Sequence, residues 1–188
     1  MRYLNGLLLV ALLSALQGCF PIVAAGLGAG ALAGADRRTM GSQLEDTTIE
    51  SKAASQIRSQ YKDTVHVNVT SFNRYALITG EVPSEEIKAG VEKIVSGVSN
   101  VKSVSNELLL AEPSSLAKRS NDSLITSNVK LRFLNNKTFQ PDHVKVVTEA
   151  NVVFLMGLVY HKEAEAAADI ASNSKAVDRV VTMFEYLD

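Results

Sequence analysis

The hydrophobic and polar positions of this 188-residue chain divide it into an apolar leader and two similar downstream segments. Residues 7–16 are apolar apart from Ser14, and residues 20–35 carry no charge. From about residue 46 onward, two hydrophobic periods alternate. Apolar residues at every fourth position predict helices, whereas apolar residues at every second position predict strands.

The downstream part is a tandem duplication, because residues 46–110 and 122–188 share a pattern of matching positions. The first predicted helix carries Asp46, Ile49, Ala53 and Ile57, and the second repeat carries Asp122, Ile125, Val129 and Phe133 at an offset of 76. The histidine and glycine positions His66 and Gly80 recur as His143 and Gly157 at an offset of 77. One-residue shifts of this kind are expected where loops differ in length.

Each repeat predicts the order helix, strand, strand, helix, strand. The elements expected are 47–60, 64–71, 75–82, a helix from Ser84 and 101–110 in the first repeat, then 122–135, 143–149, 152–159, a helix from near His161 and 177–187 in the second. Asp46 and Asp122 are expected near the caps of the first helices, since aspartate is favoured there. The fold class is therefore α+β, with two tandem αββαβ units, each a small three-stranded mixed sheet packed with two helices.

Two short runs carry a family resemblance. They are Ala-x-Ile-x-Gly-x-Val at 76–82 and Val-x-Leu-x-Gly-x-Val at 153–159, supported by Val-x-x-Val steps at 101–104 and 177–180. On these residues each repeat resembles the BON domain, named for bacterial osmotically induced and nodulation proteins. The expected domains are 46–112 and 121–188, joined by a linker at 113–120.

The turns between the first two strands depart from this family. Family members often carry Asn-Gly there, whereas this chain has Asn73-Arg74 and Ala150-Asn151. Without glycine, a tight primed turn is less favoured at both hairpins. Gly80 and Gly157 are interpreted as points of close backbone approach or bulges.

The leader ends in Leu16-Gln17-Gly18-Cys19, and Cys19 is the only cysteine in the chain. With Arg2 before the apolar run, this pattern resembles a bacterial lipobox. The resemblance implies that residues 1–18 are a signal peptide and that Cys19 carries N-acyl and S-diacylglycerol chains (palmitate among them), followed by a tether over 19–45. Phe20 after the cysteine favours the outer membrane, with the protein facing the periplasm. The alternative is one uncleaved apolar stretch from Leu4 to Ala35 that spans a bilayer.

Composition and motifs give no sign of catalysis. The isoelectric point of about 6.3 argues against nucleic-acid binding, which needs a basic surface. His66, His143 and His161 lack the spacing of metal ligands, and no nucleophile or phosphate-binding motif is present. We therefore expect a non-enzymatic protein without catalytic residues, metal or cofactor beyond the acyl chains. The sequence assigns no oligomeric state.

The two repeats differ most in their first helices. The second repeat has Leu124, Leu131 and Leu134 on a face away from the core stripe, and residues 118–137 hold five cations against one aspartate. An apolar helix face bordered by cations is typical of an interfacial helix on anionic lipid. The candidate phospholipid-binding residues are Leu124, Ser127, Asn128, Lys130, Leu131, Arg132, Leu134 and Lys137. The alternative is that the leucines pack against the first repeat.

A lipobox followed by two such units resembles the dual-BON outer-membrane lipoproteins associated with division and envelope stress. The resemblance implies binding of anionic phospholipid by the second unit and a role in outer-membrane integrity, including at division sites. The alternative function is a protein-binding adaptor for envelope assembly or cell-wall remodelling enzymes, using the same helix or a strand edge.

Overall fold

The computed structural model describes residues 36–188, which belong to one compact unit. The predicted signal peptide, the lipidated Cys19 and the tether as far as residue 35 lie outside the described residues. The described part confirms the predicted class, an α+β fold with two successive αββαβ domains.

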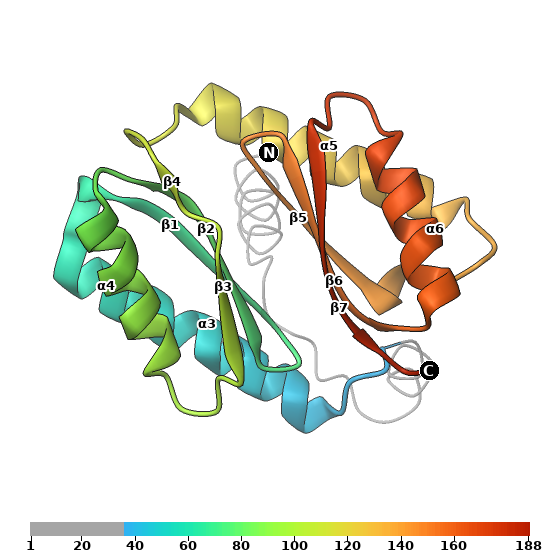
Figure 1. Cartoon of the computed structure of the whole chain (residues 1–188), viewed down its shortest axis with the longest axis horizontal. Coiled ribbons are helices and arrows are strands. Elements are labelled where there is room, and N and C mark those ends of the chain that lie inside the picture. The colour runs from blue at the N-terminus through green and yellow to red at the C-terminus, as the bar shows by residue number, and fades with distance from the viewer. Residues whose placement is uncertain (1–35) are drawn as a thin grey trace, which may run out of the picture. The chain divides into compact units, whose positions relative to one another are not determined.

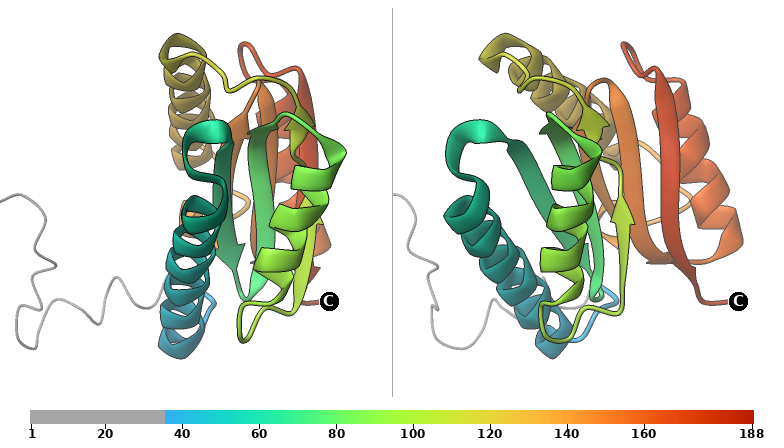
Figure 2. Two further views of the ribbon diagram at one scale, coloured as in Figure 1. Left: turned by 90° about the vertical axis from the view of Figure 1, so that its left-hand side faces the viewer. Right: turned by 60° about the vertical axis from the view of Figure 1, so that its left-hand side comes forward.

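The first domain packs two helices on one sheet (Figures 1 and 2). Its elements are α3 (Met40–Tyr61), the short 3-10 helix η1 (Lys62–Thr64), β1 (His66–Phe72), β2 (Tyr75–Val82), α4 (Glu85–Ser96), β3 (Ser103–Asn106) and β4 (Leu109–Leu110). The central strand β2 pairs antiparallel with β1 and parallel with β3 and β4, so the sheet is mixed.

The second domain repeats this arrangement. Its elements are α5 (Leu116–Leu134), the 3-10 helix η2 (Pro141–His143), β5 (Val144–Glu149), β6 (Val152–Val159), α6 (His161–Ser172) and β7 (Arg179–Tyr186). Strand β6 is central, antiparallel to β5 and parallel to β7. The parallel pair in each domain is possible because a helix provides the crossover between its strands.

The helix stripes found in the sequence form the core of each domain. Ile49, Ala53 and Ile57 of α3 are buried with residues of β2 and α4. In the second domain the equivalent stripe of α5 is buried with β6 and α6, and it consists of Ile125, Val129 and Phe133.

The expected caps of the first helices are wrong. Helices α3 and α5 begin one to two turns before the aspartates, because Thr39 and Ser115 are the N-caps and accept hydrogen bonds from the N–H groups of Ser42 and Lys118. Asp46 and Asp122 are instead buried inside the helices, at 3% and 5% exposure.

Both hairpins form tight primed turns despite lacking glycine. Asn73 and Arg74 have φ values of 50° and 70°, and the equivalent residues of the second hairpin, Ala150 and Asn151, have values of 49° and 61°. Such left-handed backbone is strained for residues with a side chain. The tight primed turn that the sequence disfavours therefore forms in both hairpins, and the buried aspartates supply the reason.

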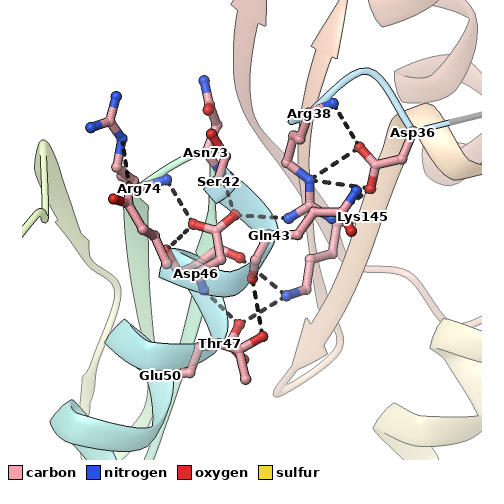
Figure 3. Close-up of polar contacts among 12 residues, drawn as sticks. Asp36, Arg38, Ser42, Gln43, Asp46, Thr47, Glu50, Asn73, Arg74 and Lys145 are labelled. Carbon is pink, nitrogen blue, oxygen red and sulfur yellow. Dashed lines mark hydrogen bonds and ion pairs between the residues drawn. The ribbon is translucent and has the colours of Figure 1, made fainter. Parts of the chain in front are cut away.

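Asp46 holds the first turn in place (Figure 3). Its carboxylate accepts hydrogen bonds from the N–H groups of Asn73 at 2.8 Å and Arg74 at 2.7 Å, and from the Ser71 hydroxyl at 2.7 Å. Asp122 accepts the two N–H groups of the second turn at 3.1 and 2.9 Å. A buried carboxylate on the first helix thus takes the role that glycine has in other primed turns.

The interpretation of the two glycines as points of close approach is confirmed. A Cβ atom on Gly80 would overlap the carbonyl oxygen of His66, and one on Gly157 would overlap that of His143. Gly80 also has a φ of +118°, and it lies opposite the interruption between β3 and β4. The last strand of the first domain is therefore divided in two, whereas β7 is continuous over eight residues.

The two domains meet through the sheet faces that are turned away from their helices. Phe72 and Leu77 of the first domain and Phe154 and Met156 of the second form one buried cluster. Because neighbouring residues of a strand point to opposite faces, Leu77 lies in this cluster while Ala76 and Ile78 face the helices. The central strands are therefore buried on both sides.

Two adjacent arginines connect the start of the described chain to both domains. Arg37 donates two hydrogen bonds to the Glu163 carboxylate, at 2.6 and 2.9 Å, and a third to the carbonyl of Leu158. Arg38 pairs with Asp46 of the first domain at 2.8 Å. We call Arg37 and Arg38 the arginine clasp.

Candidate functional site

Helix α5 places two different faces on opposite sides. Its inner stripe is buried in the second domain, whereas four leucines on the other side are exposed. We call them the leucine face, and their exposed fractions are 78% for Leu116, 69% for Leu124, 61% for Leu131 and 66% for Leu134. With 19 residues, α5 gives this face a length of about 28 Å.

The leucine face does not pack against the first domain, so the alternative of an interdomain contact is wrong for this face. The domains use the Phe72, Leu77, Phe154 and Met156 cluster instead. An exposed run of large apolar residues on a single helix is the feature that marks an interaction surface.

The polar members of the predicted site divide into three groups. Ser127, Asn128 and Lys130 are exposed on α5. Arg132 is only partly exposed, and its guanidinium donates a hydrogen bond to the Ser174 hydroxyl at 2.9 Å. Lys137 is exposed but lies in the loop after the helix, three residues beyond its end.

Leu116 was missed in the sequence because the helix was expected to begin at residue 122. The signal was Ser115, a favoured N-cap residue placed directly before Leu116. With Leu116 included, the exposed leucines extend from the first residue of α5 to the last.

The equivalent helix of the first domain has no such face along most of its length. Thr48, Ser55 and Arg58 of α3 occupy the positions of Leu124, Leu131 and Leu134 at the same offset of 76. The exposed large apolar residues of α3 are Met40 and Leu44, both near its start. The duplication therefore supplies a polar counterpart of the site within the same molecule.

The buried Asp122 makes the outer charge of α5 more positive than its sequence indicates. The residue is 5% exposed, and its carboxylate accepts hydrogen bonds from the N–H groups of the second hairpin turn. The cations Lys118 and Lys130, in contrast, are exposed. The exposed charge of α5 is therefore entirely cationic.

A cleft of about 400 Å³ lies beside α5. Its lining comes from β1, α5 and β5, and includes His66, Asn68, Arg119, Thr126 and Glu149. The cleft therefore borders both domains. It adds a concave polar surface to the inner side of the same helix.

The three histidines have different surroundings. The Nδ1 atom of His66 lies 2.8 Å from a carboxylate oxygen of Glu81, its partner in the β1–β2 register. The Nδ1 atom of His143 lies 3.7 Å from Oε1 of Glu163. His161 pairs with Asp188 at 2.7 Å on the surface and stacks on Tyr186.

The arginine clasp shifts the ionisation of its acidic partners. Burial alone would raise the pKa of Glu163, but the Arg37 guanidinium, the N–H group of Tyr160 and nearby positive charge lower it below its usual value. Burial of Asp36 is likewise outweighed by hydrogen bonds from Arg38, so its pKa is also lowered. Both acids are charged at neutral pH.

Comparison with known proteins agrees with this architecture. The family model of the BON domain matches residues 45–112 and 121–188, so the chain is a tandem BON-domain protein. It is 39% identical over 178 residues to the outer membrane lipoprotein DolP of Haemophilus influenzae, covering 92% of this chain and 91% of that protein. The chain belongs to the family of outer-membrane lipoproteins that carry two BON domains.

Two further relatives match this chain at lower identity and over shorter lengths. The 21 kDa hemolysin of Actinobacillus pleuropneumoniae is 30% identical over 154 residues, covering 81% of this chain and 79% of that protein. The osmotically-inducible protein Y of Escherichia coli is 29% identical over 145 residues, covering 75% and 71%.

The family assignment confirms the predicted resemblance and the predicted outer-membrane location. Within residues 36–188, no helix has the length and apolar character needed to cross a membrane.

Proposed function

We propose that this protein is a non-enzymatic, periplasm-facing lipoprotein that binds anionic phospholipid through the leucine face of α5. By doing so it helps to maintain outer-membrane integrity, including at division sites. The observation that carries the proposal is the exposure of Leu116, Leu124, Leu131 and Leu134, at 61–78%, while the apolar contact between the domains is made by the Phe72, Leu77, Phe154 and Met156 cluster.

The energetics of such a contact are favourable. Full burial of a leucine side chain is worth about 1.5–3 kcal/mol, so a leucine that is two-thirds exposed gains about 1–2 kcal/mol on entering the apolar edge of a bilayer. Lys118 and Lys130 each add about 1 kcal/mol near an anionic surface. The sum is enough for a helix that lies in the interface and does not cross the membrane.

The second attachment is the acyl anchor proposed at Cys19. One acyl chain binds a membrane only weakly, whereas two or three hold a protein stably. In this proposal the anchor keeps the protein on the membrane, and α5 adds selectivity for anionic headgroups.

Vesicle flotation of residues 36–188 tests the α5 contact without the anchor. This fragment retains the arginine clasp, and its three hydrophobic clusters are all supplied by residues 49–184. We expect it to float with vesicles of phosphatidylethanolamine and phosphatidylglycerol, and to stay in solution with phosphatidylethanolamine and phosphatidylcholine. High salt should release it, because the headgroup attraction is screened.

The substitution Leu131→Asp removes one leucine and adds a repelled charge, so we expect at least a tenfold loss of vesicle affinity, since tenfold corresponds to about 1.4 kcal/mol. The duplication offers a matched control, Ser55→Asp, at the equivalent exposed position of α3. The control should bind like the parent fragment, and both variants should keep the parent melting temperature.

Two outcomes refute the proposal. One is anionic-vesicle binding that Leu131→Asp leaves intact. The other is a fragment that binds neither vesicle type, which would assign the leucine face to a protein partner and make the protein an adaptor for envelope assembly. The double substitution of Lys130 and Lys137 to Glu tests the electrostatic part, and binding that survives it at low salt would show that the cations play no role.

A further inference from the structure

Three potential metal ligands converge where the two domains meet. The Nδ1 atom of His66 lies 2.8 Å from Oε2 of Glu81 and 3.9 Å from Oε1 of Glu149. The ligand atoms of all three side chains lie within 4.8 Å of one another. His66 and Glu81 come from β1 and β2 of the first domain, whereas Glu149 ends β5 of the second.

This spacing suits a small divalent cation. In a tetrahedral zinc site the Zn–N and Zn–O bonds are about 2.0–2.2 Å long, which puts neighbouring ligand atoms about 3.3–3.6 Å apart. The two shorter separations here fall on either side of that range, so small side-chain rotations bring the atoms onto one ion. An imidazole and two carboxylates are ligands that Zn²⁺ accepts, and three protein ligands leave its fourth position open.

The two carboxylates are buried, which separates this cluster from ordinary surface acids. Glu81 is 4% exposed and Glu149 is 7% exposed. Two buried carboxylates beside one imidazole form a set of ligand atoms whose negative charge a bound cation would neutralise.

The groups around the trio orient it. The Asn68 side chain donates to Oε2 of Glu149 at 3.1 Å, which leaves Oε1 directed toward His66. The N–H group of Ser114 donates to Glu81 at 3.2 Å. Such outer contacts fix ligand side chains in metal sites. His66, Asn68 and Glu149 also line the cleft beside α5, which provides an entry path for an ion.

The repeat shows that the trio is no common requirement of the fold. At the offset of 77, the position equivalent to Glu81 in the second domain is Leu158, and the position equivalent to Glu149 in the first domain is Phe72. His66 alone is retained, as His143. Among residues 36–188, a histidine and two glutamates therefore come together only at this interdomain position.

From these observations, the geometry points to a zinc site formed by His66, Glu81 and Glu149, which links the two BON domains beside α5. His66 and Glu149 line the cleft, so a fourth ligand would reach the ion from there. The site is independent of the leucine face, since none of its ligands belongs to α5.

Equilibrium dialysis of ZnCl₂ against the full lipidated chain in a non-ionic detergent tests this site, with a purification tag free of histidine and prior treatment with a chelator. We expect one Zn²⁺ per chain, with no binding of Mg²⁺, which prefers an all-oxygen octahedral shell. His66→Ala and Glu149→Gln should each weaken Zn²⁺ affinity at least tenfold. His161→Ala, which removes the exposed histidine paired with Asp188, is the matched control and should leave affinity unchanged.

Thermal melting followed by far-UV circular dichroism gives a second readout. Zn²⁺ should raise the melting temperature of the parent protein and of His161→Ala, because a ligand that binds only the folded state stabilises it. Glu149→Gln preserves side-chain shape, so it decides the matter if His66→Ala fails to fold. Absence of Zn²⁺ binding by the parent protein, or unchanged affinity in Glu149→Gln, would overturn the proposal.

Discussion

Replacing Asp46 with alanine should destabilise the first domain severely, although the sequence indicates no more than a helix cap at this position. Its carboxylate accepts hydrogen bonds from the Ser71 hydroxyl, the N–H groups of Asn73 and Arg74, and the Arg38 guanidinium, all between 2.7 and 2.8 Å. Alanine would leave these donors without their acceptor and would release a turn whose central residues both have positive φ.

The magnitude follows from the two backbone donors. Leaving a buried N–H group unpaired costs about 1–3 kcal/mol, and hydrogen bonds to a charged acceptor are worth about 1.5–3 kcal/mol each. Because the contacts of one carboxylate are not additive, we expect a loss of about 3–5 kcal/mol in the free energy of unfolding. For a chain of this size that corresponds to a fall in melting temperature of roughly 10 °C.

Urea unfolding of the 36–188 fragment, followed by far-UV circular dichroism, measures the loss. Asp63→Ala, at an exposed position of η1, is the control and should change the free energy of unfolding by less than about 0.5 kcal/mol. Adding Arg74→Gly to Asp46→Ala should recover about 1 kcal/mol, since glycine adopts the positive φ at that position without strain.

The reasoning is refuted if Asp46→Ala costs less than about 1 kcal/mol, because two unpaired backbone donors cannot be that inexpensive. That result would show that the carboxylate does not hold the turn.

Two further predictions concern the domain junction and the arginine clasp. Phe154→Ala should lower the free energy of unfolding by about 3–5 kcal/mol, because it removes a large buried side chain from the cluster that joins the domains. Urea unfolding should then show two transitions in place of one. A single transition with an unchanged midpoint would contradict this prediction. The pKa of Glu163 is lowered in the folded state, so the stabilisation from Arg37 is complete above the unfolded pKa of about 4.3 and is lost as the pH falls through the lower folded pKa. Arg37→Ala should therefore destabilise the fragment by about 1–2 kcal/mol at pH 7 and by progressively less as the pH falls below about 4.3. A loss of stability that does not change with pH would count against the ion pair.

Periodicity predicted the fold class and the core stripes well because both depend on local spacing. Ile49, Ala53 and Ile57 lie four residues apart, and any helix through them buries one face. The starts of the helices were harder to predict, since Asp46 has the chemistry of a cap but uses it on a hairpin that is remote in sequence.

The interdomain contact could have been predicted from the central strands. Ala76-Leu77-Ile78 and Val153-Phe154-Leu155-Met156 are unbroken apolar runs, which indicate strands buried on both faces. The alternative prediction placed the leucines of α5 in the interdomain contact, which the central strands form instead. Leu116 was not predicted as part of the face because α5 begins six residues before the predicted start at residue 122.

The cluster of His66, Glu81 and Glu149 had no signal in the sequence. Its members come from three strands, and one of them belongs to the other repeat. Motif spacing records ligands that share one element or loop. A site assembled by the pairing of strands and the docking of domains becomes visible only in three dimensions.

The arginine clasp has a mechanical consequence. Arg37 and Arg38 are consecutive in the chain, yet Arg37 forms an ion pair with Glu163 in the second domain and Arg38 forms one with Asp46 in the first. Tension that arrives along the chain from its N-terminal side therefore pulls on both domains at once. If the chain were held only at α3, the same force could detach that helix from its sheet. Because the two ion pairs hold both domains, the force acts on both together and their separation is resisted.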